Sequence, residues 1–168
     1  SGSTLSLERR KRLVLLADQY GVPIIEDDPY GQLRYDGEHI PSVATLDSRY
    51  RNDHDGEYTG NVIYLSTFSK KLLPGLRVGW VAAPAPVLDR LVALKQVADN
   101  GSSPLLQAAL HDFLAEGGLD EHLARVRPAY RERRDTSLVL VCDACGQAFP
   151  VNLTDRGKAK RLKARLKK

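Results

Sequence analysis

The sequence predicts an α/β fold, formed as part of a mostly parallel sheet that helices cover on both sides. Three apolar runs have the length and composition of buried strands, at residues 22–28, 61–67 and 77–84. Amphipathic helical patterns precede the first run and follow the third. This alternation is typical of helix-covered sheets, whose strands are apolar on both faces. With 168 residues, the chain fits one domain or a piece of a larger one.

The first part of the chain reads as a helix, a strand and then polar sequence. A helix is expected over residues 6–20, because Ser6 is a suitable N-cap and Gly21 a suitable end. The run VPIIEDD at 22–28 follows as a short strand with a continuous apolar centre. The polar segment 46–60 is expected to be an exposed loop.

Helical patterns dominate after the third strand. One helix is expected over residues 87–98, and Pro104 suits the first position of the next. A last helix is expected over 119–134, with a bend at Pro128. Beyond residue 136 the pattern weakens to a possible strand and turn.

The charge distribution separates the tail from the rest of the chain. The net charge is +4, but residues 156–168 alone hold eight basic and no acidic side chains. The remaining 17 basic (25 − 8) and 21 acidic residues leave residues 1–155 with a charge of −4, so they carry no nucleic-acid footprint. No apolar run approaches the roughly 18 residues of a membrane span, and no signal peptide is visible. The single pair Cys142 and Cys145 is too small for a disulfide framework or a four-ligand zinc site, so a cytoplasmic setting is expected.

Two of the predicted strands end in residues that carry chemistry. The candidates are Asp27, Tyr30, Thr67, Ser69, Lys70 and Arg77. Because ligands of open α/β sheets bind just beyond the carboxyl ends of the strands, these side chains are expected to share one cleft. A lysine amine beside hydroxyls and an arginine suits a phosphate-bearing ligand with a reactive aldehyde.

Neighbouring residues have plainer interpretations. Lys71 is expected to be a solvated surface residue, and Asp28 a turn residue before Pro29. Tyr64 and Trp80 are expected in the core rather than in the site. The histidines show no metal-like spacing; they are His39, His54, His111 and His122.

Several stretches resemble the class I/II aminotransferases, which are pyridoxal phosphate (PLP) enzymes of fold type I. They are SGSTLS, PIIEDDPYGQLRYDG, VIYLSTFSKKLLPGLRVGW and LKQVADNGSSPLLQAAL, in that order. The likeness is nearest to the 2-aminoadipate and kynurenine aminotransferase branch and covers about residues 1–135. It implies transfer of an amino group from an amino acid to a 2-oxo acid, and a homodimer.

The resemblance also implies a role for each candidate residue. Lys70 matches the lysine that forms an imine with PLP and later moves the Cα proton. Asp27 matches the carboxylate that pairs with the pyridine nitrogen, and keeps the ring an electron sink. Tyr30 matches the phenol that hydrogen-bonds to the 3-oxygen of the cofactor.

The remaining candidates match the phosphate site of the family. Thr67 and Ser69 match hydroxyls that bind the phosphate, although the first is often serine in the family. Arg77 matches the phosphate-binding arginine. No metal is implied.

The chain departs from the family in its extent. It matches about the middle third, so the aromatic residue that stacks on the ring and the small domain with the carboxylate-binding arginine are not expected in it. Of an NPTG-like motif only Ser1 and Gly2 remain. Residues 1–135 are therefore expected to be a partial PLP-binding large domain, and 136–168 a divergent basic tail, disordered or from a shifted reading frame.

Two other functions stay open. One is the PLP-binding effector domain of a winged-helix transcription regulator, and the other is an inactive truncated chain. Such regulators tend to read DYDSEF where this chain reads DPYGQL, which favours the enzyme.

Overall fold

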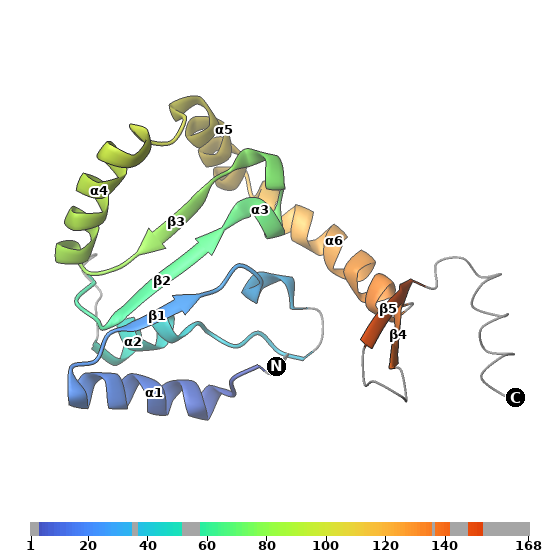
Figure 1. The fold of residues 1–168 in the computed structure, drawn as a ribbon, viewed down its shortest axis with the longest axis horizontal. Coiled ribbons are helices and arrows are strands. Elements are labelled where there is room, and N and C mark those ends of the chain that lie inside the picture. Colours follow the sequence, from blue (N-terminus) through green and yellow to red (C-terminus); the bar gives the residue numbers. More distant parts are fainter. Residues whose placement is uncertain (1–3, 35–36, 52–57, 136, 142–147, 153–168) are drawn as a thin grey trace, which may run out of the picture. The chain divides into compact units, whose positions relative to one another are not determined.

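The computed structural model describes residues 4–34, 37–51, 58–135, 137–141 and 148–152. The chain divides into two compact units, residues 1–122 and 123–168. In chain order the elements are α1 (Leu7–Tyr20), β1 (Ile24–Asp27), η1 (Gly31–Leu33), α2 (Val43–Arg51), β2 (Val62–Thr67), α3 (Phe68–Lys71), η2 (Pro74–Leu76), β3 (Gly79–Ala82), α4 (Ala85–Asp99), α5 (Pro104–Ala115), α6 (Gly118–Asp135), β4 (Ser137–Val141) and β5 (Ala148–Asn152) (Figure 1).

The first unit contains a three-stranded sheet in the order β1-β2-β3. β1 pairs with β2 in parallel, whereas β3 pairs with β2 in the antiparallel sense. Only residues 68–78 separate β2 from β3, fewer than the dozen or so that a parallel crossover needs, so the chain turns back. The α/β class is confirmed, and the described sheet is mixed.

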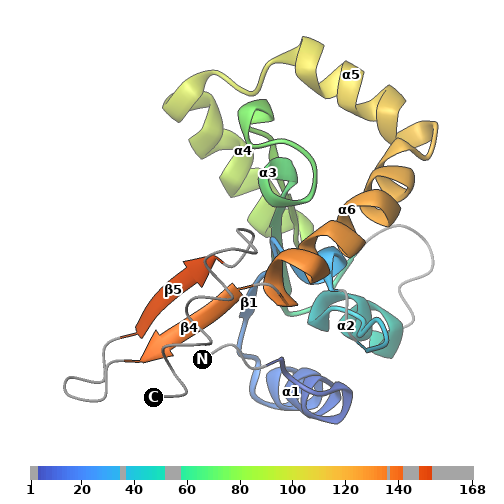
Figure 2. The same cartoon turned by 90° about the vertical axis from the view of Figure 1, so that its right-hand side faces the viewer.

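Helices α1 and α2 lie side by side and pack on one face of the sheet (Figure 2). The core between them and β2 is formed by Val14, Val43 and Val62. In β1, side chains alternate between half-buried and exposed, and Ile25 on the opposite face is 69% exposed. The prediction that this strand is covered on both faces is therefore wrong for the described residues, because the helices cover only the face of Ile24.

The predicted loop at 46–60 begins inside a helix, because α2 extends to Arg51. The first two amides of α2 are bound by a residue distant in the sequence, since Val43 N and Ala44 N each donate to a carboxylate oxygen of Glu26 at 2.9 Å. A carboxylate at a helix N-terminus accepts hydrogen bonds from amides that have no partner in the helix, and its negative charge interacts favourably with the helix dipole. Since Glu26 lies on β1, no local pattern around residue 46 indicates this cap.

The carboxylate of Asp47 closes the end of this segment. Asp47 is 1% exposed, and its Oδ2 accepts hydrogen bonds from the Tyr58 hydroxyl at 2.5 Å and from Asn61 N at 2.7 Å. Arg51 Nε donates to Oδ1 at 3.3 Å. Burial and the Asp47 carboxylate raise the pKa of Tyr58. A Cβ on Gly60 would lie 2.2 Å from Asp47 Oδ2, so this turn requires glycine.

Most predicted helix boundaries are confirmed. Gly21 ends α1 in the left-handed conformation with φ 60°. Pro104 begins α5, and the Ser103 hydroxyl caps it by accepting from Leu106 N at 3.5 Å. Ser6 occupies the N-cap position of α1 without a side-chain cap bond.

In the second unit, β4 and β5 pair in the antiparallel sense. The pair Cys142 and Cys145, and the basic segment 156–168, lie outside the described residues. In the part of the chain that is described, no helix is long and apolar enough to span a bilayer.

Candidate functional site

Three segments with candidate residues meet at one edge of the sheet. β1 and β2 run in parallel, so Asp27 and Thr67 both lie at carboxyl ends that point the same way (Figure 1). β3 runs in the opposite sense and Thr67 is paired with Gly79, so its first residues start from that edge. Arg77, just before β3, is therefore brought to the same edge.

Asp27 and Tyr30 are exposed at the end of β1. Asp27 follows the alternation of the strand, so it shares the uncovered face of Ile25 rather than the helix-covered face of Glu26. Tyr30 is 58% exposed. Both side chains are thus open to a ligand at this edge.

Thr67 and Ser69 interact with each other at the start of α3. Thr67 Oγ1 accepts from Ser69 N at 3.1 Å and caps the helix. Its one proton is directed either to Val78 O at 3.0 Å or to Ser69 Oγ at 3.1 Å. Ser69 accepts in that second bond and keeps its own proton to donate, so Ser69 is the better placed of the two hydroxyls to bind an anion.

The two adjacent lysines occupy opposite environments. Lys70 is exposed, whereas Lys71 is 2% exposed. The prediction that Lys71 is solvated is wrong. The reason is helical spacing: Phe68 and Lys71 are three residues apart on α3, so they share its inward face.

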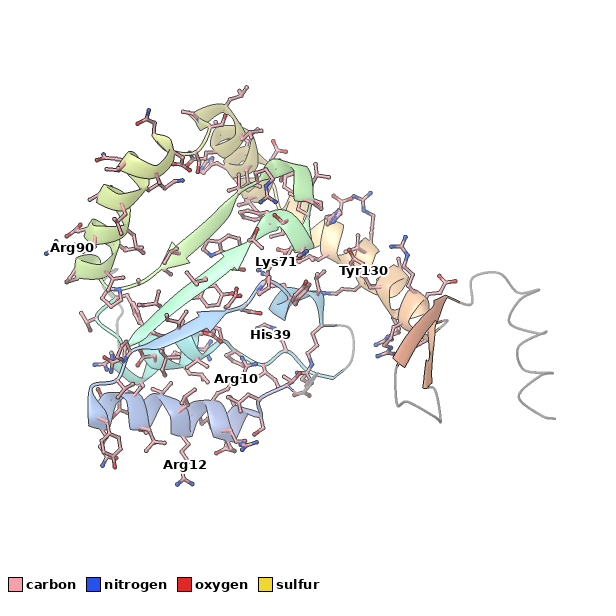
Figure 3. All side chains as sticks on the ribbon, viewed as in Figure 1. Arg10, Arg12, His39, Lys71, Arg90 and Tyr130 are labelled. Atoms are coloured by element: carbon pink, nitrogen blue, oxygen red, sulfur yellow. The ribbon has the colours of Figure 1, made fainter. Side chains whose placement is uncertain are left out.

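The Lys71 ammonium lies against the sheet on the side of Ser66 and Trp80 (Figure 3). Its Nζ donates to Ser66 Oγ at 2.9 Å and lies 4.7 Å from the centroid of the Trp80 ring, within cation–π range. Trp80 also packs on Phe68, with ring centroids 4.6 Å apart. Burial lowers the pKa of Lys71, and the charge of Asp28 partly opposes this effect.

Asp28 is more than a turn residue. Its Oδ1 accepts from Gly31 N at 2.7 Å, which is the expected turn bond, but its Oδ2 also accepts from the Tyr64 hydroxyl at 3.1 Å. Burial raises the pKa of Tyr64, and the Asp28 carboxylate adds to the increase. Ser66 Oγ donates to the backbone oxygen of Asp28 at 2.7 Å. The only signal in the sequence that Lys71 joins Ser66 and Asp28 here is its helical spacing from Phe68.

Arg77 is exposed and has the left-handed conformation with φ 53°. This conformation is unfavourable for a residue with a Cβ, and such strain often marks functional positions. The turn holds it in place, with Arg77 N donating to Pro74 O at 3.4 Å.

No metal site is found among the described residues. No group of three or more His, Cys, Asp or Glu side chains there could hold an ion. His54 lies outside the described residues, as do the two cysteines.

Comparison with known proteins identifies the family. The sequence model of "Aminotransferase class I and II" matches residues 1–151, so the chain belongs to this family. Aromatic-amino-acid aminotransferase 1 of Thermococcus litoralis is 39% identical over 138 residues, which are 82% of this chain and 31% of the enzyme. The uncharacterized HTH-type transcriptional regulator YisV of Bacillus subtilis is also 39% identical over 138 residues, 82% of this chain and 26% of the regulator.

Solved structures of aminotransferases have the same fold over this region. LysN, the α-aminoadipate aminotransferase of Thermus thermophilus, is 38% identical with a TM-score of 0.70, over 81% of this chain and 33% of that protein. The kynurenine aminotransferase of Pyrococcus horikoshii is 35% identical with a TM-score of 0.70, over 81% of this chain and 31% of that protein. The chain therefore spans about a third of the length of these proteins.

Proposed function

We propose that the chain is the cofactor-binding segment of a PLP-dependent aminotransferase, which transfers an amino group from an amino acid to a 2-oxo acid. The observation that carries the proposal is the meeting of an exposed amine, carboxylate, phenol and guanidinium at one edge of the sheet. LysN was solved with N-(5'-phosphopyridoxyl)-L-leucine, and the kynurenine aminotransferase with PMP. Both complexes support PLP as the cofactor.

The donor set at this edge fits PLP. Lys70 offers an exposed amine to the aldehyde. Ser69 offers a hydroxyl proton and Arg77 a guanidinium to the phosphate, while Thr67 holds Ser69 through the helix cap.

The other residues act on the ring. When bound, PLP supplies a ring that accepts the electron pair released at the substrate Cα. We assign to Asp27 the role of holding a proton on the ring nitrogen, and to Tyr30 a hydrogen bond to the 3-oxygen. Lys70 Nζ would take up the Cα proton and deliver it to the cofactor carbon that carried the aldehyde, so that the amino group stays on the cofactor.

Further parts of the proposal concern the whole protein. We infer that it is a cytoplasmic homodimer whose substrates are an amino acid and a 2-oxo acid. Residues 1–135 would be part of its large domain, with residues 136–168 as a separate segment.

A second candidate is the effector domain of a transcription regulator. The match to the regulator YisV supports this candidate, because YisV is as identical to this chain, over the same number of residues, as the aromatic aminotransferase. The sequence DPYGQL after β1 favours the enzyme.

Covalent trapping of PLP tests the cofactor assignment. The chain is incubated with PLP and reduced with borohydride, and peptide mass spectrometry then locates the phosphopyridoxyl group. We expect the label on Lys70, and none on the Lys70→Ala variant. A label that stays at the same level in that variant would contradict the assignment, and Lys95→Ala, at an exposed lysine of α4, is the control.

Product analysis separates the two candidate functions. The PLP-loaded protein is incubated with a panel of amino acids, and conversion of PLP to PMP is measured by chromatography. Conversion with at least one amino acid supports the aminotransferase. Trapped PLP without conversion by any amino acid counts against an active aminotransferase and fits the regulator or an inactive truncated chain.

A further inference from the structure

The proposed reaction leaves one buried charge without a role, the ammonium of Lys71. Its described surroundings are a hydroxyl, an aromatic ring and the charge of a carboxylate. The hydroxyl belongs to Ser66, the ring to Trp80 and the carboxylate to Asp28. A buried ammonium with one hydroxyl acceptor is costly, because an apolar side chain would fill the same space without losing hydration. The position of its contacts suggests what the charge does.

The contacts of Lys71 lead from one part of the proposed site to the other. Lys71 Nζ donates to Ser66 Oγ at 2.9 Å, and Ser66 Oγ donates to Asp28 O at 2.7 Å. Asp28 then fixes the start of η1, since Gly31 N donates to Asp28 Oδ1 at 2.7 Å. The chain of bonds thus runs from α3 to the segment that follows β1.

These two segments carry the proposed catalytic groups. α3 carries Lys70 next to Lys71, while Asp27 ends β1 directly before Asp28 and Tyr30 follows in the next segment. We propose that Lys71 is a positioning residue, whose link through Ser66 to Asp28 sets the orientation of Lys70 relative to the segment after β1. This inference rests on the proposed function.

The shortness of α3 makes such a link necessary. The helix has four residues, so it contributes few hydrogen bonds of its own, and both Leu72 N and Leu73 N share the single acceptor Phe68 O, at 2.8 and 3.2 Å. Phe68 N ties the start of α3 to the segment before β3 by donating to Val78 O at 3.1 Å. The inward side chains add to this, with Phe68 on the Trp80 ring and Lys71 on Ser66 and the same ring. Only Lys71 connects α3 to Asp28 among these contacts.

The first test measures how fast PLP attaches to Lys70. Samples of the chain at several PLP concentrations are reduced at timed intervals, and the label at Lys70 is quantified. The dependence on concentration separates the first-order rate constant of attachment from the saturation constant. The variants are Lys71→Met, which keeps the length of the side chain, Ser66→Ala, and both together, with Lys95→Met as the control at an exposed lysine.

We expect Lys71→Met and Ser66→Ala each to lower the first-order rate constant by about tenfold, the kind of loss that a small misplacement of a reacting group produces. The double variant should be no slower than the slower single variant, because both changes break one link. A purely structural role would reduce the amount of folded protein, and hence the final label, but not the rate constant. A wild-type rate constant in both single variants overturns the inference.

The second test needs no cofactor. Hydrogen exchange of the Gly31 amide reports on the far end of the link, because this amide donates to Asp28. We expect faster exchange in Lys71→Met and in Ser66→Ala, with unchanged exchange at the amides of Val43 and Ala44, which Glu26 binds. Unchanged exchange at Gly31 in both variants overturns the link.

The two tests separate the two proposals. If the wild-type chain acquires no label at Lys70, the proposed function fails, and the exchange of Gly31 alone then decides whether the link exists. If the label appears normally at Lys70 but the variants behave as wild type, only the role of Lys71 is refuted.

Discussion

Replacing Lys71 by methionine should change how the stability of the chain depends on pH. Methionine has a similar length and no charge, so it occupies the same space beside Ser66 and Trp80. Burial lowers the pKa of Lys71 below its ordinary value of 10.5. The unfolded chain therefore holds a proton on this lysine at pH values where the folded chain has released it.

The sign of the effect follows from proton linkage. Between the lowered folded pKa and 10.5, the unfolded state binds more protons, so the free energy of unfolding rises with pH. One such group contributes at most about 1.4 kcal/mol per pH unit. Below the folded pKa the lysine is charged in both states, and its contribution is lowest and constant.

The absolute effect at neutral pH is a small difference between large terms. Substitution removes a charge-assisted hydrogen bond, about 1.5–3 kcal/mol, and a cation–π contact, about 1–2 kcal/mol. It also removes a desolvation cost of several kcal/mol. The prediction therefore concerns how the difference in unfolding free energy changes with pH, rather than its value at one pH.

Urea denaturation measures this slope. Wild type and Lys71→Met are unfolded at constant ionic strength from about pH 7 to about pH 11. The difference in unfolding free energy, wild type minus variant, should rise towards pH 10.5 and then level off. Groups present in both proteins, such as Tyr64 with its raised pKa, cancel in the difference. A flat difference, or one that falls with pH, would refute the burial argument, and Lys95→Met is the matched control at a lysine that is 48% exposed.

Three further predictions concern stability, each measured by urea denaturation near neutral pH. At Arg77, with φ 53°, glycine should be more stable than alanine by about 1 kcal/mol, and at Arg90 within α4 the order should reverse by a similar amount. Asp47→Ala should lower the free energy of unfolding by about 3–5 kcal/mol, because three half-buried donors lose their acceptor. Glu26→Ala should lower it by about 1–2 kcal/mol, because the first two amides of α2 lose the one carboxylate that accepts from both.

Each prediction has an opposing result. Alanine matching or exceeding glycine at Arg77 would show that the left-handed conformation is not imposed on this residue. A loss below about 1 kcal/mol for Asp47→Ala would show that the donors to Asp47 find other hydrogen-bond acceptors. An unchanged free energy of unfolding for Glu26→Ala would show that the Glu26 cap does not stabilise α2.

Local patterns predicted the three strands and most of the helices, because each depends on residues close in the sequence. The left-handed Gly21 and the helix start at Pro104 are such features. The helix α2 was missed although its start has a local signal, because the Ser42 hydroxyl accepts from Thr45 N at 3.1 Å. The second cap, by Glu26, lies 17 residues before Val43 and is visible only in the fold.

The candidate site divides in the same way. The order and spacing of Asp27, Lys70 and Arg77 are visible in the sequence, and they carried the resemblance to the family that the comparisons show. Their roles as cofactor ligands remain predictions. The sequence also predicted that they share one cleft, but it could not indicate that the third strand is antiparallel, which places Arg77 before β3 at the same edge as the ends of β1 and β2.

The sequence by itself determined the family, the order of the three strands and of the helices other than α2, and which residue types stand at the ends of the strands. Only the tertiary structure decided which of two adjacent lysines is buried. Lys71 shares the inward face of α3 with Phe68 and meets the side chains of β2 and β3, while Lys70 points away. The physical reason is that burial depends on what lies opposite a side chain, and the strands opposite Lys71 assemble only in the folded sheet.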